Sequence, residues 1–312
     1  WRRAMGRYVV RRLLQMVPVV IGTTFVIFAM VWAVPGDPFA GKCGDRPCPA
    51  PYVAVMTDKF NLDESIFVQY ALYMGNLLQG DFGETFGGVQ VVDELQLRYP
   101  TTLKLALLAI VIEILIGITA GILAGLRRGG FADTLVLVST LLVISIPVFV
   151  IGYLLQLLLG VKLELFPVTV SAGAPLNELV LPAFVLASTS LAYVARLMRA
   201  NLAENLHADF VRTATAKGLS RGRVVGVHTV RNSLIPVVTF IGADFGALLG
   251  GAIVVEGIFN INGVGGLIFG SIRTREGAMV TGAVTVLVIV FLLVNLLVDL
   301  LYAVLDPRIR YD

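Results

Sequence analysis

Six long apolar stretches leave this chain few ways to fold. A helix needs about 20 apolar residues to cross a bilayer. Stretches of that length lie at about 8–34, 103–126, 133–160, 179–199, 233–256 and 279–305. Only 14% of the residues are charged and the mean hydropathy is +0.87, whereas soluble domains carry about 25% charged residues. The sequence therefore predicts an all-α integral membrane protein with six transmembrane helices.

The basic residues predict how these helices are oriented. Lys and Arg concentrate in cytoplasmic loops. In the six-helix arrangement, one side carries 16 of the 24 basic residues: Arg2, Arg3, Arg7, Arg11, Arg12, Arg127, Arg128, Arg196, Arg199, Arg212, Lys217, Arg221, Arg223, Arg231, Arg308 and Arg310. We therefore expect both termini and residues 200–232 to be cytoplasmic, in a multi-pass protein of the plasma membrane. Residues 35–100, which carry nine acids and none of these sixteen basic residues, are expected outside.

The outer segment 35–100 is the largest piece between the predicted spans. Five prolines between 35 and 51 forbid a continuous helix there. Apolar residues then recur at helical spacing and predict an amphipathic helix over about 63–79 at the membrane surface. A second outer loop, Gly257 to Gly277, is glycine-rich and predicts tight turns with two short re-entrant helices.

The two cysteines, Cys43 and Cys48, both lie in the proline-rich segment. Two cysteines are too few for a disulfide scaffold or a cysteine-based zinc site. Because the outer side of the membrane is oxidising, we expect a local disulfide between them. Two free thiols are the alternative, and the role of the segment is open.

A short polar segment, DFVRTATAKG at 209–218, separates the fourth and fifth spans. Its pattern is helical, Asp209 can cap the first turn, and Gly218 can take the left-handed position after the last turn. A capped helix kept on a cytoplasmic loop is typical of a docking site. A solvated basic loop that only fixes the topology is the alternative. The predicted apolar contacts of the helix are Phe210, Val211 and Ala214.

Several segments, in order, resemble the permease subunits of ABC importers. VRTATAKGL at 211–219 and HTVRNSLIP at 228–236 are similar to the peptide and nickel branch of that family. The segments RRLLQMVPVVIGTTFVIFAMVWAVPGDPF, GNLLQGDFGETF, VVEGIFNINGVGGLIFGSI and LDPRIR look like the B subunits of dipeptide permeases. The family's coupling loop, the EAA loop, reads Glu-Ala-Ala, three residues, then Gly. Here those positions are Arg212-Thr213-Ala214 and Gly218, so an arginine replaces the acid.

The resemblance implies a type I ABC importer permease fold and a function. The chain would form half of a pathway that imports di- or oligopeptides. ATP and Mg would bind to two separate ATP-binding subunits, and this chain would hold no cofactor. A second homologous permease subunit and an extracytoplasmic substrate-binding protein would complete the importer. The residues that the resemblance assigns to ATPase coupling are Asp209, Phe210, Val211, Arg212, Thr213, Ala214, Lys217 and Gly218.

Small residues predict two packing faces. Four-residue spacing of glycine lets helix backbones approach closely. The glycines concerned are Gly117, Gly121 and Gly125 in the second span and Gly242, Gly246 and Gly250 in the fifth. Packing within the subunit is favoured over a sliding surface that changes between transport states.

Three residues inside predicted spans are candidates for the translocation pathway. A buried acid at mid-membrane costs on the order of 3 kcal/mol on insertion scales, so Glu113 and Asp244 should face a partner, water or the pathway. The alternative is a structural role, in which each acid forms a hydrogen bond or ion pair between helices. Pro147 removes a backbone hydrogen bond and predicts a kink in the third span, either for packing or as a hinge.

Two other functions are compatible with the sequence. Nickel permeases belong to the same branch as peptide permeases. A secondary transporter or channel would instead need inverted repeats and acids along an ion path. The only histidines, His207 and His228, lack metalloprotease spacing, so the sequence predicts neither an enzyme nor a metal site.

Overall fold

The computed structural model describes residues 2–33, 38–39, 42–44 and 46–305, with side chains described from Val9 to Leu300. Five of the basic residues that predict the orientation therefore lie outside the described side chains: Arg2, Arg3, Arg7, Arg308 and Arg310. The described chain is helical, with one isolated antiparallel bridge between Glu84 and Gln90.

Five helical segments are long and apolar enough to cross a membrane, and a bent pair can make a sixth. The five segments are Val9–Trp32, Val91–Leu126, Leu176–Asn205, Arg221–Phe259 and Gly277–Leu300. The first, third and fifth of these are single helices: α1 (Arg2–Trp32), α8 (Leu176–Asn205) and α13 (Gly277–Leu305). The second consists of α4 (Val91–Ile112), the π-helical η1 (Glu113–Ile118) and α5 (Thr119–Leu126). The fourth consists of α10 (Arg221–Arg223), the π-helical η3 (Val224–Val230) and α11 (Arg231–Phe259).

The third predicted span is broken rather than kinked. Phe131–Ser145 (α6) and Val148–Lys162 (α7 with the π-helical η2, Gln156–Lys162) meet at 105°. Pro147 lies at the break and precedes α7, and Ile146 before it is extended, with φ −104° and ψ 127°. A residue before proline avoids the helical region, and proline cannot donate to the preceding turn. The bend predicted at Pro147 is therefore present, and it is sharp enough to divide the segment 133–160 into two helices.

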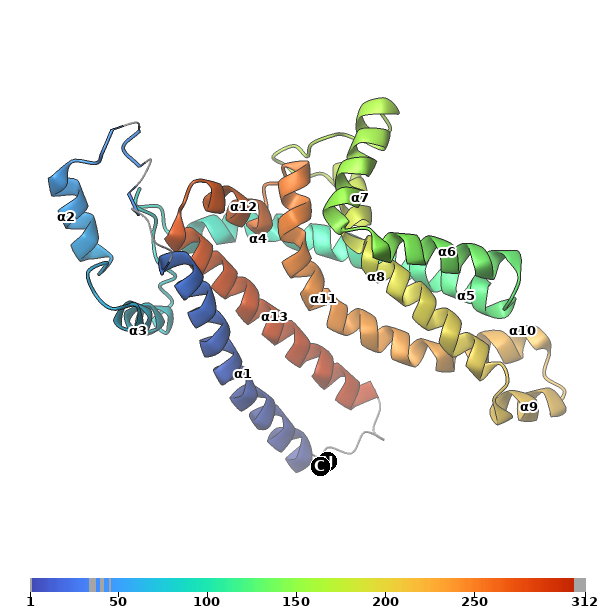
Figure 1. Cartoon of the computed structure of the whole chain (residues 1–312). Helices are drawn as coiled ribbons and strands as arrows, with labels where there is room; N and C mark the ends of the chain where they lie inside the picture. The colour runs from blue at the N-terminus through green and yellow to red at the C-terminus, as the bar shows by residue number, and fades with distance from the viewer. Residues whose placement is uncertain (1, 34–37, 40–41, 45, 306–312) are drawn as a thin grey trace.

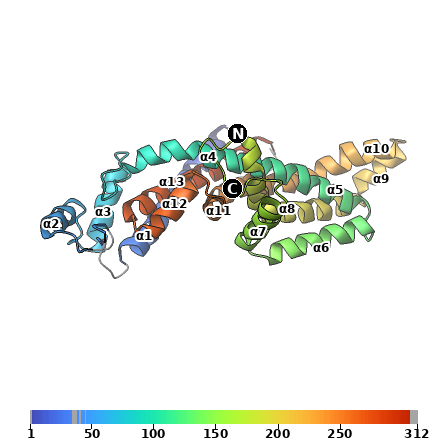
Figure 2. The same cartoon turned by 90° about the horizontal axis from the view of Figure 1, so that it is seen from above.

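The helices form two groups joined at one end (Figure 1). Helices α1 and α13 run side by side in one group, and α5, α6, α8 and α11 form the other. Viewed from above, α4 runs along the molecule from the first group to the second (Figure 2). Helix α8 lies at the centre of the second group, and about two thirds of the residues in its apolar 18-residue stretch are buried. Helices α2 (Ala50–Lys59) and α3 (Ile66–Leu77) lie at the opposite end of the molecule from α9 (Asp209–Ala216) and α10.

Two predicted boundaries shift because helices extend beyond their apolar cores. The second span begins at Val91 rather than near 103, and the fifth begins at Arg221 rather than near 233. Since α8 ends at Asn205, the connection to the fifth span covers 206–220 and is shorter than the predicted 200–232. Hydropathy detects only the part of a helix that the hydrocarbon requires.

The outer segment contains two helices, α2 (Ala50–Lys59) and α3 (Ile66–Leu77). Helix α3 corresponds to the predicted amphipathic helix, but α2 was not predicted. It starts directly after Pro49 and has proline in its first turn, where a missing N–H costs nothing. Tyr73 fixes α3 to α13 by donating to Thr285 Oγ1 at 2.9 Å, and burial raises the pKa of Tyr73 to about 12.

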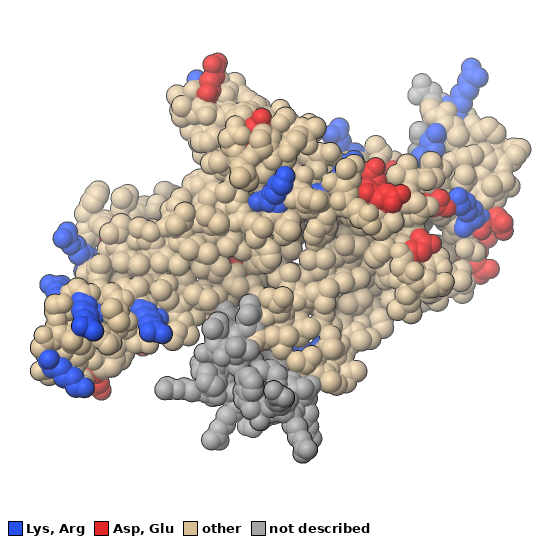
Figure 3. Space-filling model, turned by 180° about the vertical axis from the view of Figure 1, so that it is seen from behind, with Lys and Arg blue, Asp and Glu red and all other residues tan. Residues whose placement is uncertain are grey.

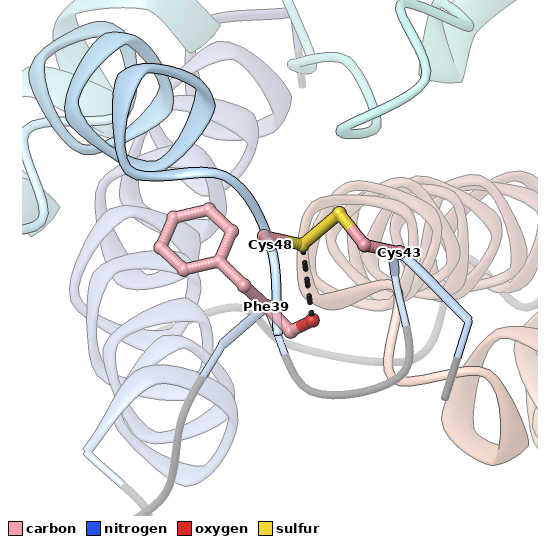
Figure 4. Close-up of a disulfide and its surroundings, with 3 residues drawn as sticks. All are labelled: Phe39, Cys43 and Cys48. Atoms are coloured by element: carbon pink, nitrogen blue, oxygen red, sulfur yellow. Dashed lines mark hydrogen bonds between the residues drawn. A yellow bond between two sulfur atoms is a disulfide. The ribbon is translucent and has the colours of Figure 1, made fainter. Parts of the chain in front are cut away.

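A disulfide closes the loop before α2 (Figure 4). It joins Cys43 to Cys48 with Cα atoms 5.2 Å apart, and Cys48 Sγ lies 3.8 Å from the carbonyl oxygen of Phe39. Phe39 itself is buried against Phe86, with ring centroids 5.3 Å apart. The disulfide and the packing of Phe39 on Phe86 thus both constrain this loop.

The glycine face of the second span packs against α8. A Cβ atom at Gly117 would lie 2.8 Å from Val194 Cγ1, and one at Gly121 would lie 2.6 Å from the carbonyl oxygen of Ala195. Gly125 is similarly close to Leu202, at 3.1 Å. Only glycine permits this approach of two helix backbones.

The second predicted glycine face is only partly a packing face. At Gly246 a Cβ would lie 2.7 Å from the ring of Phe291 on α13, whereas around Gly250 there is open space. The prediction that Gly250 packs within the subunit is therefore wrong. Gly242 lies on the same helix, α11.

We predict that Gly121→Ala lowers the stability of the detergent-solubilised protein by roughly 1–3 kcal/mol, because the new methyl group overlaps the backbone of α8. Gly250→Ala is the matched control, since it adds the same methyl group to a membrane helix where nothing lies within 4 Å. Thermal unfolding followed by circular dichroism measures both. Equal unfolding midpoints for the two variants would contradict this account of the packing.

Candidate functional site

The predicted docking segment folds as a separate short helix, α9 (Asp209–Ala216), directly after α8. Its N-cap is Ala208 and no side chain caps it, so the prediction that Asp209 caps the first turn is wrong. Asp209 occupies the first helical position, where a negative charge favours the helix dipole. It lies 3.5 Å from Arg212, and both side chains are exposed.

Gly218 ends α9 in the left-handed conformation, with φ +79°. The amide of Leu219 donates to the carbonyl of Ala214, and that of Gly218 donates to Thr215. These two bonds form a Schellman motif, which satisfies the last carbonyls of the helix. A β-branched residue at Gly218 would be strained there.

The exposed face of α9 differs in one residue from the predicted one. Ala214 is only 7% exposed, so it does not belong to the free face of the helix. Phe210 is 39% exposed and Val211 is half-buried. Arg212, Thr213 and Lys217 are exposed. The free face therefore combines one aromatic ring with two cations.

Basic side chains gather at the end of the molecule that carries α9 and α10, whereas acidic ones gather toward the outer helices (Figure 3). At the α9 end they include Arg212, Lys217, Arg221 and Arg223, all of which are exposed. The charge separation seen in the sequence is thus also a separation in space. A surface of this kind favours an acidic or polar partner.

An ion pair that sequence reasoning missed ties α6 to α8. Asp133 is 3% exposed and accepts hydrogen bonds from Arg199, with Nη2 to Oδ2 at 2.9 Å, and from the amide of Gly129 at 2.8 Å. From the sequence, Arg199 serves only to predict the orientation of the helices. The sequence feature that could have indicated a role for Asp133 is its place in the first turn of a helix after Gly129-Gly130, where a carboxylate can bind free amides.

The two candidate pathway acids come from facing elements in the second group. Glu113 begins η1 and is fully buried, and neither of its carboxyl oxygens has a hydrogen-bond partner. Asp244 on α11 is half-buried, and its Oδ2 has no hydrogen-bond partner. The two are close enough for their charges to interact. Among the described residues no ion pair includes either acid.

A third buried acid, Glu256, organises the loop after α11. It is fully buried and its Oε2 accepts from the amide of Gly266 at 2.8 Å, in the first turn of α12 (Val264–Arg273). Arg98 of α4 donates to Asn262 Oδ1 at 2.6 Å. This loop contains one short helix rather than the two that were predicted. Sequence reasoning did not single out Glu256.

The site contains no candidate metal centre within the described residues, where no group of three or more His, Cys, Asp or Glu side chains could hold an ion. The structure brings Glu113 and Asp244 together, but it places α9 and the Pro147 break in separate regions. The candidate site is therefore two sites: an exposed helix, and two acids of which Glu113 is buried and Asp244 half-buried.

Comparisons with known proteins identify the family. Residues 117–311 match the model of the binding-protein-dependent transport system inner membrane component, and residues 5–106 match its N-terminal membrane component. The oligopeptide transport system permease protein AppB of Bacillus subtilis is 33% identical over 98% of this chain and 100% of its own length. The di/tripeptide transport system permease protein DppB of Pseudomonas aeruginosa is 35% identical, covering 98% of this chain and 99% of its own length.

The glutathione transport system permease protein GsiC of Escherichia coli K12 is 37% identical, over 98% of this chain and 100% of its own length. Taken together, the two family models extend over both helix groups, and so does each of the three relatives. This chain belongs to the family of binding-protein-dependent transport system inner membrane components, and it is a multi-pass permease with the type I ABC importer fold.

Proposed function

We propose that this chain forms half of a pathway that imports di- and oligopeptides, driven by ATP that separate subunits hydrolyse. The observation that carries the proposal is the full-length similarity to permeases named for oligopeptides, di- and tripeptides and glutathione. Glutathione is itself a tripeptide, so the three cargoes share one chemical class.

Helix α9 is the proposed contact with an ATP-binding subunit. Its free face presents Phe210 between cations, and a hydrophobic anchor with a charged rim is the usual composition of a docking helix. Helix α9 directly follows α8, which packs on the glycine face of the second span. A displacement of α9 would therefore reach the centre of the membrane domain. The ATP and Mg belong to the partner, and this chain acts without a cofactor.

The orientation follows from the charges. We place α9 and both termini in the cytoplasm, and α2 and α3 outside. An extracytoplasmic substrate-binding protein would then meet the outer helices. A second homologous permease subunit would complete the pathway.

The acid pair and the Pro147 break are the proposed pathway elements. Unpartnered carboxyl oxygens inside a membrane domain are costly, and function is the common reason for retaining them. Asp244 is the better candidate because it is half-buried, whereas Glu113 is fully buried. A peptide carries an ammonium group whatever its side chains, which is a constant partner for such an acid.

We predict that Gly218→Val abolishes transport-linked ATP hydrolysis but leaves membrane insertion intact. The β-branched side chain cannot take φ +79° without strain of about 1–2 kcal/mol, so the Schellman turn and the pose of α9 change. The control is Gly222→Val, because Gly222 has open space around it and no positive φ. ATPase activity of the reconstituted complex is measured with binding protein and peptide.

Phe210→Asp tests the same contact without disturbing the turn, because Phe210 is exposed. The ATP-binding subunits should no longer co-purify with this variant, while Val227→Asp, at a position that is 51% exposed compared with 39% for Phe210, should retain them. Normal ATPase coupling in both Gly218→Val and Phe210→Asp would exclude α9 as the docking helix.

We predict ATP-dependent uptake of a labelled di- to pentapeptide by proteoliposomes that hold the complete importer and its binding protein. Asp244→Asn should lower this uptake by about tenfold, since removing a charged hydrogen-bond partner costs roughly 1.5–3 kcal/mol. Asp63→Asn, an exposed acid in the outer segment, is the control.

The rival cargo is tested in the same vesicles. Nickel prefers imidazole and thiolate ligands, and the described residues hold no cluster of them. ATP-driven nickel uptake without peptide uptake would overturn the proposed cargo. Peptide uptake unaffected by Asp244→Asn would overturn only the pathway role of the acid.

A further inference from the structure

A groove of about 650 Å³ lies where α1, α12 and α13 meet, at the ends of α1 and α13 opposite the termini. Its walls are apolar and include Met30, which is 69% exposed, and Ile272, which is 58% exposed. Trp32 lines it at the last turn of α1, and tryptophan is typical of the level where hydrocarbon meets headgroups. The volume is in the range of ligand pockets.

The groove exists because α1 and α13 approach closely beneath it. A Cβ atom at Gly277, the first residue of α13, would lie 2.8 Å from Val31 Cγ1 and 3.2 Å from the ring of Trp32. The two helices therefore make a continuous floor. Val280 and Val284 continue that floor along α13.

One unbalanced positive charge stands at the rim. The rim carries Glu276 and Arg275, but Glu276 is paired with Lys42, which also donates to the carbonyl of Thr274 at 3.1 Å. Arg275 is exposed and forms no ion pair with any described residue. The result is an apolar groove with a free guanidinium at its polar end.

Arg275 is also held in an unfavourable backbone conformation. It follows the C-cap of α12, Thr274, and has φ +55°. This is the left-handed position after a helix, where glycine is favoured and a residue with a Cβ atom is strained. A long basic side chain at a strained position points to a role for that side chain.

We propose that this groove binds a membrane phospholipid, with an acyl chain along the α1–α13 floor and the phosphate on the guanidinium of Arg275. Arginine matches phosphate oxygens in a bidentate geometry. The charge complementarity and the position at the end of two spans both favour a phospholipid over a protein partner. The proposal is independent of the cargo and of the ATPase contact.

The test is native mass spectrometry of the purified complete transporter, titrated with palmitoyl-oleoyl phosphatidylglycerol or with diacylglycerol of the same chains. Arg275→Gly should relieve the backbone strain and keep the fold. It should nevertheless lower retention of the phospholipid by about tenfold, because a charged hydrogen bond to the phosphate is lost. Retention of diacylglycerol should not change. Arg275→Gln should likewise lower retention of the phospholipid and leave retention of diacylglycerol unchanged.

Arg273→Gln is the matched control, because Arg273 is exposed two residues earlier and does not line the groove. Val280→Trp should fill the floor and displace both lipids. Equal phospholipid retention by wild type and Arg275→Gly, or no retention by wild type, would overturn the proposal. So would efficient cross-linking of Met30→Cys to another protein subunit, since a protein would then cover the groove.

Discussion

The contact between the glycine face of the second span and α8 is the constraint on which the rest of the structure depends. At Gly121 the two backbones are so close that a single methyl group would lie 2.6 Å from a carbonyl oxygen. Lipid gives no hydrophobic drive for helix association, so close van der Waals packing must supply it. This contact buries α8 at the centre of its group, where α8 packs against α6 and α11 and leads directly into α9, which packs on η3.

Three polar contacts extend that packing to the ends of the molecule. Arg199 on α8 and Asp133 on α6 bind each other where α8 approaches the basic end. At the other end, Glu256 holds the first turn of α12 and Arg98 holds the same loop to α4. Buried charges are costly unless they are paired and hydrogen-bonded. Each of these groups therefore fixes the geometry of a loop that would otherwise be free to vary.

The fold could be predicted from sequence wherever one strong physical requirement acts alone. The need for about 20 apolar residues located the spans, and four-residue glycine spacing located the packing face at Gly117, Gly121 and Gly125. Prediction failed where a tertiary contact decided the outcome. Ala214 turned inward because α9 packs on its own chain. At Pro147 the sequence predicted the bend, but not that it would reach 105°. Asp133 and Glu256 became important only through partners distant in sequence or across a turn.

We propose that α8 joins a docking helix, α9, on the cytoplasmic side to a membrane domain whose helices α2 and α3 face the opposite side. Cysteines placed singly at Ser220, after α9, and at Ser65, before α3, test it directly, because both positions are exposed and the two native cysteines are already joined. A membrane-impermeant maleimide applied to sealed, right-side-out vesicles should label Ser65→Cys and leave Ser220→Cys unlabelled until the membrane is opened. Labelling of both cysteines from the outside, or of Ser220→Cys alone, would contradict the account.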